Sequence, residues 1–124
     1  MSNKKILIAE DSSVIQNIAK KVLGFQGYDI LIAKNGKEVL EKVQNENFDV
    51  ILMDINIPHI DGMECAKQIR ALSDVEKSKT PIIAVTGNAN NYSKEDFEAV
   101  GINEYMPKPI NFDLLIEYLK QLLA

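Results

Sequence analysis

The chain has 124 residues, of which 46% are apolar, so it is long enough for one domain with a substantial hydrophobic core. Its 18 acidic and 14 basic side chains give a net charge of −4, which argues against a nucleic-acid surface, since such surfaces carry a basic patch. Cys65 is the only cysteine, which excludes a disulfide framework and a cysteine-based metal site. The apolar run at residues 6–9 is too short for a signal sequence or a membrane span, so we expect a cytoplasmic protein.

Apolar, strand-like runs alternate with helical patterns along the chain. The predicted strands cover residues 5–10, 29–33, 50–54, 82–86 and 104–106. The predicted helices cover residues 14–25 after a cap at Ser12 or Ser13, 39–43, 63–72, 93–100 and 111–123. Residues 73–80 are predicted to form a polar connector, and Gly62 to provide a backbone turn. Strands separated by helices are typical of right-handed crossovers and a parallel sheet.

Polar side chains stand where the predicted strands end. Asp54 closes the most apolar run of the chain, and Glu10 and Asp11 follow the first strand. Thr86 ends the fourth strand, and Lys108 comes just after the fifth. Ligands of open parallel sheets bind outside the carboxyl ends of the strands, so we expect these five side chains to meet at one edge. Three carboxylates at such short distances repel one another unless a cation or a proton lies between them.

This set of side chains suits phosphoryl chemistry. Carboxylates with open coordination positions suit Mg²⁺, which prefers oxygen ligands and keeps several waters. A lysine and a hydroxyl group beside them suit a phosphoryl group, because both contact its oxygens. The sequence contains no GxxxxGK[ST] loop for a nucleotide. The phosphoryl group should therefore come from another donor, and one of the carboxylates can accept it.

Four segments resemble the receiver domain of two-component response regulators. They are ILIAEDS, VILMDINIP followed by HIDG, PIIAVTG and YMPKP. The resemblance covers the whole chain, residues 1–124, as one receiver domain. It implies a flavodoxin-like α/β fold, with a doubly wound five-stranded parallel sheet of strand order 2-1-3-4-5 flanked by five helices.

The resemblance also implies a role for each acidic position. Asp54 matches the aspartate that accepts the phosphoryl group, and Asp11 matches the acid that binds the metal directly. Glu10 matches the acid that acts on the metal through water, and the backbone carbonyl of Asn56 would be a further ligand beside Asp54. The implied metal is Mg²⁺ or Mn²⁺.

Other matched positions imply a conformational switch. Thr86 matches the switch hydroxyl, Tyr105 the switch aromatic residue and Lys108 the lysine that supports the phosphoryl group. The family also implies a cis peptide between Lys108 and Pro109. Asn56 and Asn88 flank the phosphoryl site in the family and are both uncharged, so we expect an unexceptional phosphoryl lifetime.

The resemblance implies partners as well as chemistry. The phosphoryl donor would be a phosphohistidine on a sensor histidine kinase or a histidine phosphotransfer protein. A downstream protein would dock on the surface formed by residues 93–100, 104–106 and 111–123, without direct contact to nucleic acid or membrane. The last helix carries a wide apolar arc, which predicts either wide packing on the sheet or a phosphorylation-dependent homodimer.

Several alternatives stay open at this point. The chain is either a stand-alone receiver, which we favour, or a receiver taken from a hybrid histidine kinase or larger regulator. We expect no enzymatic turnover beyond its own phosphorylation and dephosphorylation. A flavin carrier of the same topology would need a phosphate loop where Glu10 and Asp11 stand, and these would repel the phosphate. An aspartyl phosphatase would typically have a second acid at the position of Asn56.

Overall fold

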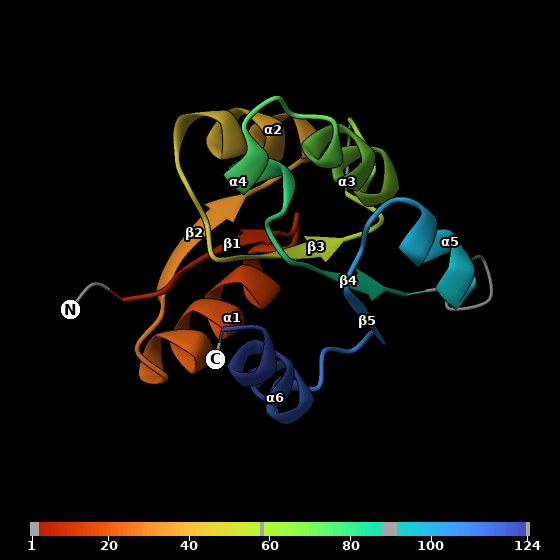
Figure 1. Cartoon of the computed structure of the whole chain (residues 1–124). Helices are drawn as coiled ribbons and strands as arrows, with labels where there is room; N and C mark the ends of the chain where they lie inside the picture. Colours follow the sequence, from red (N-terminus) through yellow and green to blue (C-terminus); the bar gives the residue numbers. More distant parts are fainter. Residues whose placement is uncertain (1–2, 58, 88–91, 124) are drawn as a thin grey trace.

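A computed structural model describes residues 3–57, 59–87 and 92–123 of the chain. The strands, which form one parallel sheet, are β1 (Lys5–Ala9), β2 (Asp29–Ala33), β3 (Val50–Asp54), β4 (Ile82–Thr86) and β5 (Glu104–Pro107). Their order across the sheet is β2-β1-β3-β4-β5 (Figure 1), which confirms the predicted topology. Within the described residues, no helix is long and apolar enough to cross a membrane.

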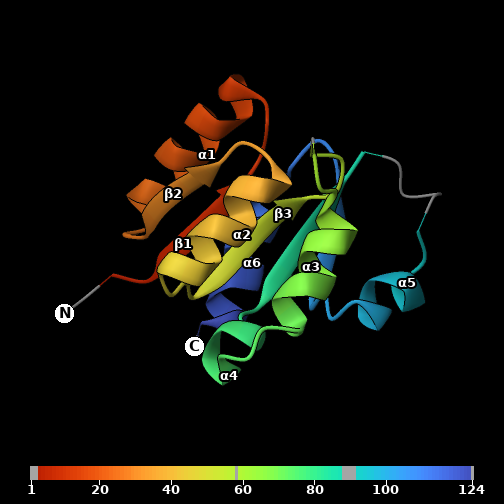
Figure 2. The ribbon, with the colours of Figure 1, turned by 90° about the horizontal axis from the view of Figure 1, so that it is seen from above.

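Helices cover both faces of the sheet. They are α1 (Ser13–Phe25), α2 (Gly36–Asn45), α3 (Gly62–Arg70), α4 (Val75–Ser78), α5 (Lys94–Ala99) and α6 (Phe112–Leu122). Helices α1 and α6 lie on one face, and α2 and α3 lie on the other with the short α4 beside them (Figure 1). Helix α5 lies near the β5 edge of the sheet (Figure 1), and the view from above shows it far from α1 (Figure 2).

The prediction of five helices is wrong by one, because the polar connector contains the single turn α4. One helical turn is too short to show an apolar period in the sequence. The turn is held by Asp74, whose side chain accepts a hydrogen bond from the backbone of Lys77 at 3.2 Å. The ammonium of Lys77 also donates to the carbonyls of Val43 and Glu46 at the end of α2, at 2.6 and 2.9 Å.

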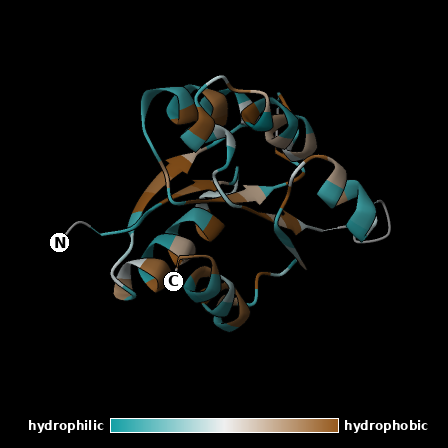
Figure 3. Ribbon diagram, viewed as in Figure 1, coloured by the Kyte–Doolittle hydropathy of each residue, from teal (hydrophilic) through white to brown (hydrophobic). Residues whose placement is uncertain are grey.

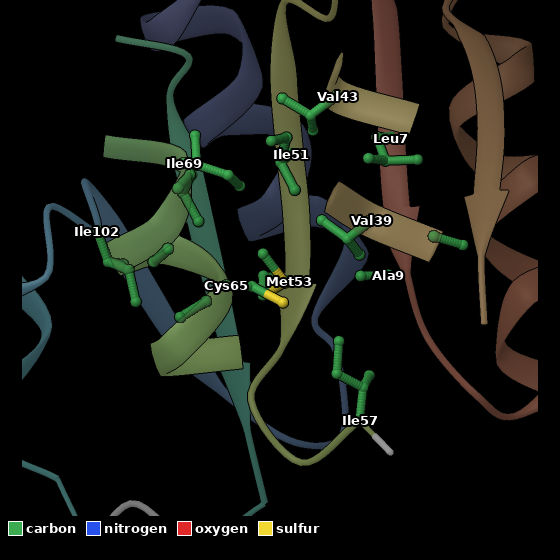
Figure 4. Packing of buried hydrophobic residues seen from close by; sticks show 14 of the residues in the cluster. Leu7, Ala9, Val39, Val43, Ile51, Met53, Ile57, Cys65, Ile69 and Ile102 are labelled. Carbon is green, nitrogen blue, oxygen red and sulfur yellow. The ribbon is translucent and has the colours of Figure 1, made fainter. Parts of the chain in front are cut away.

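The centre of the sheet is buried on both faces, because every residue of β3 and β4 is buried. Figure 3 shows largely apolar strands at the centre of the fold, between helices in which hydrophilic and hydrophobic residues are mixed. On the face of α2 and α3, Ile51 and Met53 belong to one core with Cys65 and Ile69 (Figure 4). Cys65 is fully buried, and burial followed by nearby acidic charges raises the pKa of its thiol to about 12. It is therefore an inert core residue.

Strand register brings the polar strand ends together. Ala9 of β1 pairs with Met53 of β3, so Glu10 and Asp54 occupy the next positions of two neighbouring strands. From this point β1 leads into α1 on one face of the sheet, and β3 leads into α3 on the other (Figure 1). Such a switch point leaves the carboxyl ends of the two strands open to a ligand.

Candidate functional site

Three carboxylates meet at the carboxyl edge of the sheet. Oxygen atoms of Glu10, Asp11 and Asp54 all lie within 4.8 Å of one another. Glu10 and Asp54 are buried, with 5% and 2% of their surface exposed, whereas Asp11 is exposed. The predicted convergence of these three side chains is therefore present. A cluster of this kind needs a cation or a proton to offset its mutual repulsion.

Lys108 provides one such positive charge. Its ammonium lies 2.7 Å from Oδ2 of Asp54, and the other carboxylate oxygen, Oδ1, accepts a hydrogen bond from the backbone of Asn56 at 3.0 Å. Burial alone would lower the pKa of Lys108, but the hydrogen bond to Asp54 and the charges of Asp54, Glu10 and Asp11 raise it above its usual value. Lys108 is therefore charged at neutral pH.

The charged form of Glu10 is destabilised by its surroundings. Burial, followed by its hydrogen bond with Asp54, raises the pKa of Glu10 to about 7, although a hydrogen bond from the backbone of Ser12 opposes the shift. That amide donates to Oε1 of Glu10 at 3.1 Å. Near neutral pH, and without a bound cation, Glu10 therefore carries a proton in a large fraction of molecules.

The ends of β4 and β5 place Thr86 and Lys108 at the same edge. Thr86 is buried, and its carbonyl accepts a hydrogen bond from the backbone of Lys108 at 2.8 Å. The peptide between Lys108 and Pro109 is cis, which confirms the expectation from the family. Asn88, which follows β4, and Pro58, in the loop after β3, lie outside the described residues.

Tyr105 lies partly exposed beside Phe97, a buried residue of α5. It is 40% exposed and stacks on Phe97 of α5, with ring centroids 4.8 Å apart and an interplanar angle of 23°. The stack joins β5 to α5. Tyr105 thus belongs to the surface of α5, β5 and α6, and not to the carboxylate cluster. The resemblance to the family implies that this surface takes part in switching.

A cleft of about 480 Å³ opens beside Glu10 and Asp11 of the cluster. It is lined by Glu10, Asp11, Ser12, Ile15, Lys108, Pro109 and Ile110. Sequence reasoning did not assign Ile110 to the site, although its position directly after the Lys108–Pro109 pair could have indicated it. It also missed Gln16, whose side-chain amide donates to the carbonyl of Glu10 at 2.6 Å. No pattern in the sequence predicts that contact.

Gly62 plays a different role from the predicted turn. It begins α3, and a Cβ atom at this position would lie 2.8 Å from Cα of Ile55 and 2.9 Å from the carbonyl oxygen of Asp54. Its backbone amide donates to the carbonyl of Ile55 at 2.9 Å. Gly62 is therefore required for the close approach of α3 to the end of β3. The prediction that it provides a backbone turn is wrong.

Comparison with known proteins identifies the family. A family model described as the response regulator receiver domain matches residues 6–120. The chain belongs to the response regulator receiver family. This receiver domain is 41% identical over 122 residues to hybrid signal transduction histidine kinase I of Dictyostelium discoideum. The match covers 94% of the receiver domain but only 7% of that kinase.

Two solved structures share the fold of this receiver domain. The chemotaxis protein CheY4 of Vibrio cholerae is 32% identical, with a TM-score of 0.87, and the match covers 98% of this chain and 99% of that one. The receiver domain of a Pseudomonas aeruginosa PAO1 sensor histidine kinase is 29% identical, with a TM-score of 0.88 and coverage of 99% and 100%. That structure holds a magnesium ion in its active-site cleft. The chain is thus a CheY-like receiver domain of two-component signalling.

Proposed function

We propose that this receiver domain accepts a phosphoryl group from a phosphohistidine onto Asp54. One observation carries the proposal: a buried carboxylate faces a lysine ammonium at 2.7 Å and shares its site with two further acids. In the transfer, an oxygen of Asp54 attacks the phosphorus of the phosphohistidine. The bond from phosphorus to the donor nitrogen breaks, its electron pair stays with the imidazole, and a bond to the Asp54 oxygen forms. Lys108 offsets the negative charge on the phosphoryl oxygens.

The carboxylate cluster fits a divalent cation. Three carboxylates within 4.8 Å, one of them open to solvent, match the oxygen donors that Mg²⁺ prefers. Asp11 and Asp54 would hold the ion directly, together with the backbone carbonyl of Asn56, and Glu10 would contact it through water. When bound, Mg²⁺ or Mn²⁺ would neutralise charge on the cluster and on the phosphoryl oxygens.

Helix α1 offers a docking surface for the phosphoryl donor. Ile15 lines the cleft, and the nearby Val14 and Ile18 are 64% and 41% exposed. Residues 12–28 contain no acidic side chain, and Lys20 and Lys21 are exposed on the same helix. A donor protein with an apolar, acid-flanked surface would fit beside the cleft and bring its phosphohistidine to Asp54.

The output surface of the proposed switch is formed by α5, β5 and α6. Thr86 would turn toward the phosphoryl group, and Tyr105 would change its packing against Phe97 in response. A downstream protein would dock there. On α6, Leu115 and Leu119 are buried and the remaining apolar side chains pack partly against the same core, so wide packing accounts for much of the apolar arc. Light scattering with and without a phosphoryl analogue tests for a homodimer.

We also propose that the domain acts as a stand-alone receiver that turns over no external substrate. Its match to nearly the full length of a chemotaxis protein supports this reading. Its higher identity to part of a hybrid kinase supports the alternative, a receiver within a larger protein. An immunoblot of source cells separates the two, because a stand-alone protein migrates near 13.9 kDa and a hybrid kinase far above it. Failure to hydrolyse small phosphate esters is expected in either case.

Phosphotransfer from a labelled donor tests the proposed function. Histidine kinases and phosphotransfer proteins of the source organism are labelled on histidine and mixed with the receiver domain. We expect label to move to the wild type with Mg²⁺ present and not to Asp54→Asn. Transfer to Asp54→Asn at the wild-type rate would contradict the assignment of the acceptor.

A further inference from the structure

The carbonyl of Glu10 lies just beyond the end of β1. The backbone N–H of Glu10 still bonds to the carbonyl of Ala33 at 3.0 Å, as the continuation of the sheet. Its own carbonyl instead accepts a hydrogen bond from the side-chain amide of Gln16, at 2.6 Å. At the start of the carboxylate cluster, a helix side chain thus supplies the hydrogen bond that a neighbouring strand would supply within the sheet.

This carbonyl belongs to the peptide that joins two of the three clustered acids, Glu10 and Asp11. A peptide unit is planar, so a hydrogen bond that fixes its oxygen also fixes the direction in which the next residue begins. Asp11 is exposed, and no side-chain hydrogen bond or ion pair to it is found among residues 3–57, 59–87 and 92–123. The direction of its carboxylate therefore depends on the main chain that Gln16 holds.

Gln16 is itself well anchored. Its backbone N–H donates to the carbonyl of Ser12 at 3.0 Å, near the start of α1, and its side chain is half-buried. The N–H of Ser12 holds a carboxylate oxygen of Glu10 at 3.1 Å. The first turns of α1 therefore contact Glu10 at two points, its carboxylate and its carbonyl.

We propose that Gln16 is a positioning residue for the cation site. Through the Glu10 carbonyl it orients the Glu10–Asp11 peptide so that both acids face Asp54. The inference rests on the proposed Mg²⁺ site and adds to it a residue that touches neither the cation nor the phosphoryl group. Groups that orient metal ligands in this way commonly change metal affinity by 10–100-fold when removed.

The test compares Gln16→Met, which keeps the length of the side chain and removes the donor, with Asn17→Met at the exposed neighbouring position. Isothermal titration with Mg²⁺ alone gives the dissociation constant of each protein. We expect the constant of Gln16→Met to rise about tenfold and that of Asn17→Met to stay at the wild-type value. Labelling by acetyl phosphate should slow in Gln16→Met at low Mg²⁺ and recover at saturating Mg²⁺, because the acceptor itself is intact.

The outcomes separate the two proposals. If wild type binds Mg²⁺ and Gln16→Met binds it equally well, the positioning role is wrong while the proposed function stands. The same holds if Gln16→Met only loses stability in metal-free buffer, since that indicates a purely structural contact. If wild type binds no Mg²⁺, both proposals fail. Gln16→Ala, which also removes the donor, carries the same test if Gln16→Met does not fold.

Discussion

The ammonium of Lys108 lies 2.7 Å from Oδ2 of Asp54, although 54 positions separate the two residues in the chain. The carboxylate is 2% exposed and the lysine side chain 35%. A buried carboxylate without a cation is costly, so the pair explains how Asp54 is tolerated at the end of an apolar strand. Under the proposed function, the same ammonium would offset the negative charge of a phosphoryl group on Asp54.

Replacing Lys108 should therefore weaken the fold when no metal is present. We expect Lys108→Met to lower the free energy of unfolding in metal-free buffer by about 2 kcal/mol, a value reduced for the partial exposure of the lysine. Added Mg²⁺ should recover part of this loss. Lys94→Met is the control, because Lys94 forms only an exposed pair with Glu98 at 3.9 Å and should change stability by less than about 0.5 kcal/mol. Equal effects of the two substitutions in urea unfolding would argue against the buried pair.

Glu10 should make the metal-free protein sensitive to pH. Its pKa rises from 4.5 to about 7 on folding, so the folded state binds more protons than the unfolded state between these values. Its contribution to stability is therefore present below about pH 4.5 and declines as the pH rises toward 7, by up to about 3 kcal/mol at 1.36 kcal/mol per unit. Urea unfolding of wild type and Glu10→Gln in EDTA measures this difference. A difference that does not change between pH 4.5 and 7 would contradict the shift.

Two glycines should respond to alanine in opposite directions. Gly62→Ala places a Cβ 2.8 Å from Cα of Ile55 and should destabilise the protein by about 1–3 kcal/mol, with slower phosphorylation because the end of β3 must move. Gly24 lies in α1 with nothing within 4 Å of its Cβ position. Gly24→Ala should stabilise the protein by about 0.5–1 kcal/mol. Thermal unfolding of both variants decides, and a stable Gly62→Ala would show that α3 is not in close contact with β3.

The exposed apolar residues of α1 should affect transfer from a protein donor and not from a small molecule. We expect Ile18→Ser to slow phosphotransfer from a cognate histidine donor about tenfold, equivalent to about 1.4 kcal/mol, while labelling by acetyl phosphate is unchanged. Val75→Ser serves as the control, since Val75 is 62% exposed on α4, away from the cleft. An unchanged rate with the protein donor would place the docking surface elsewhere.

Much of the fold could be predicted because each strand of a parallel sheet appears in the sequence as a short continuous apolar run. Continuous apolar runs predicted the strands, and the polar residues at the ends of four of them predicted the edge where Asp54 and Lys108 meet. The resemblance to receiver domains supplied the strand order and the cis peptide before Pro109. These features depend on the order of residues within short segments, which the sequence displays directly.

The features that could not be predicted depend on contacts between distant segments. Helix α4 is held by the contact of Lys77 with the end of α2, and Arg70 binds the carbonyls of Ser78, Thr80 and Gly101 at 2.6–3.0 Å. The bond from Gln16 to the Glu10 carbonyl depends on the angle between α1 and β1. None of these contacts follows from apolar periodicity or from a motif.

The proposed function depends on Asp54 as the acceptor of the phosphoryl group. Intact-mass spectrometry after incubation with acetyl phosphate and Mg²⁺ tests it most directly, with Asp113→Asn as a control that changes an exposed carboxylate on α6. We expect the added mass of one phosphoryl group on wild type and Asp113→Asn, and none on Asp54→Asn or in EDTA. A phosphoryl adduct that persists in Asp54→Asn, or a wild-type protein that gains no mass, would contradict it.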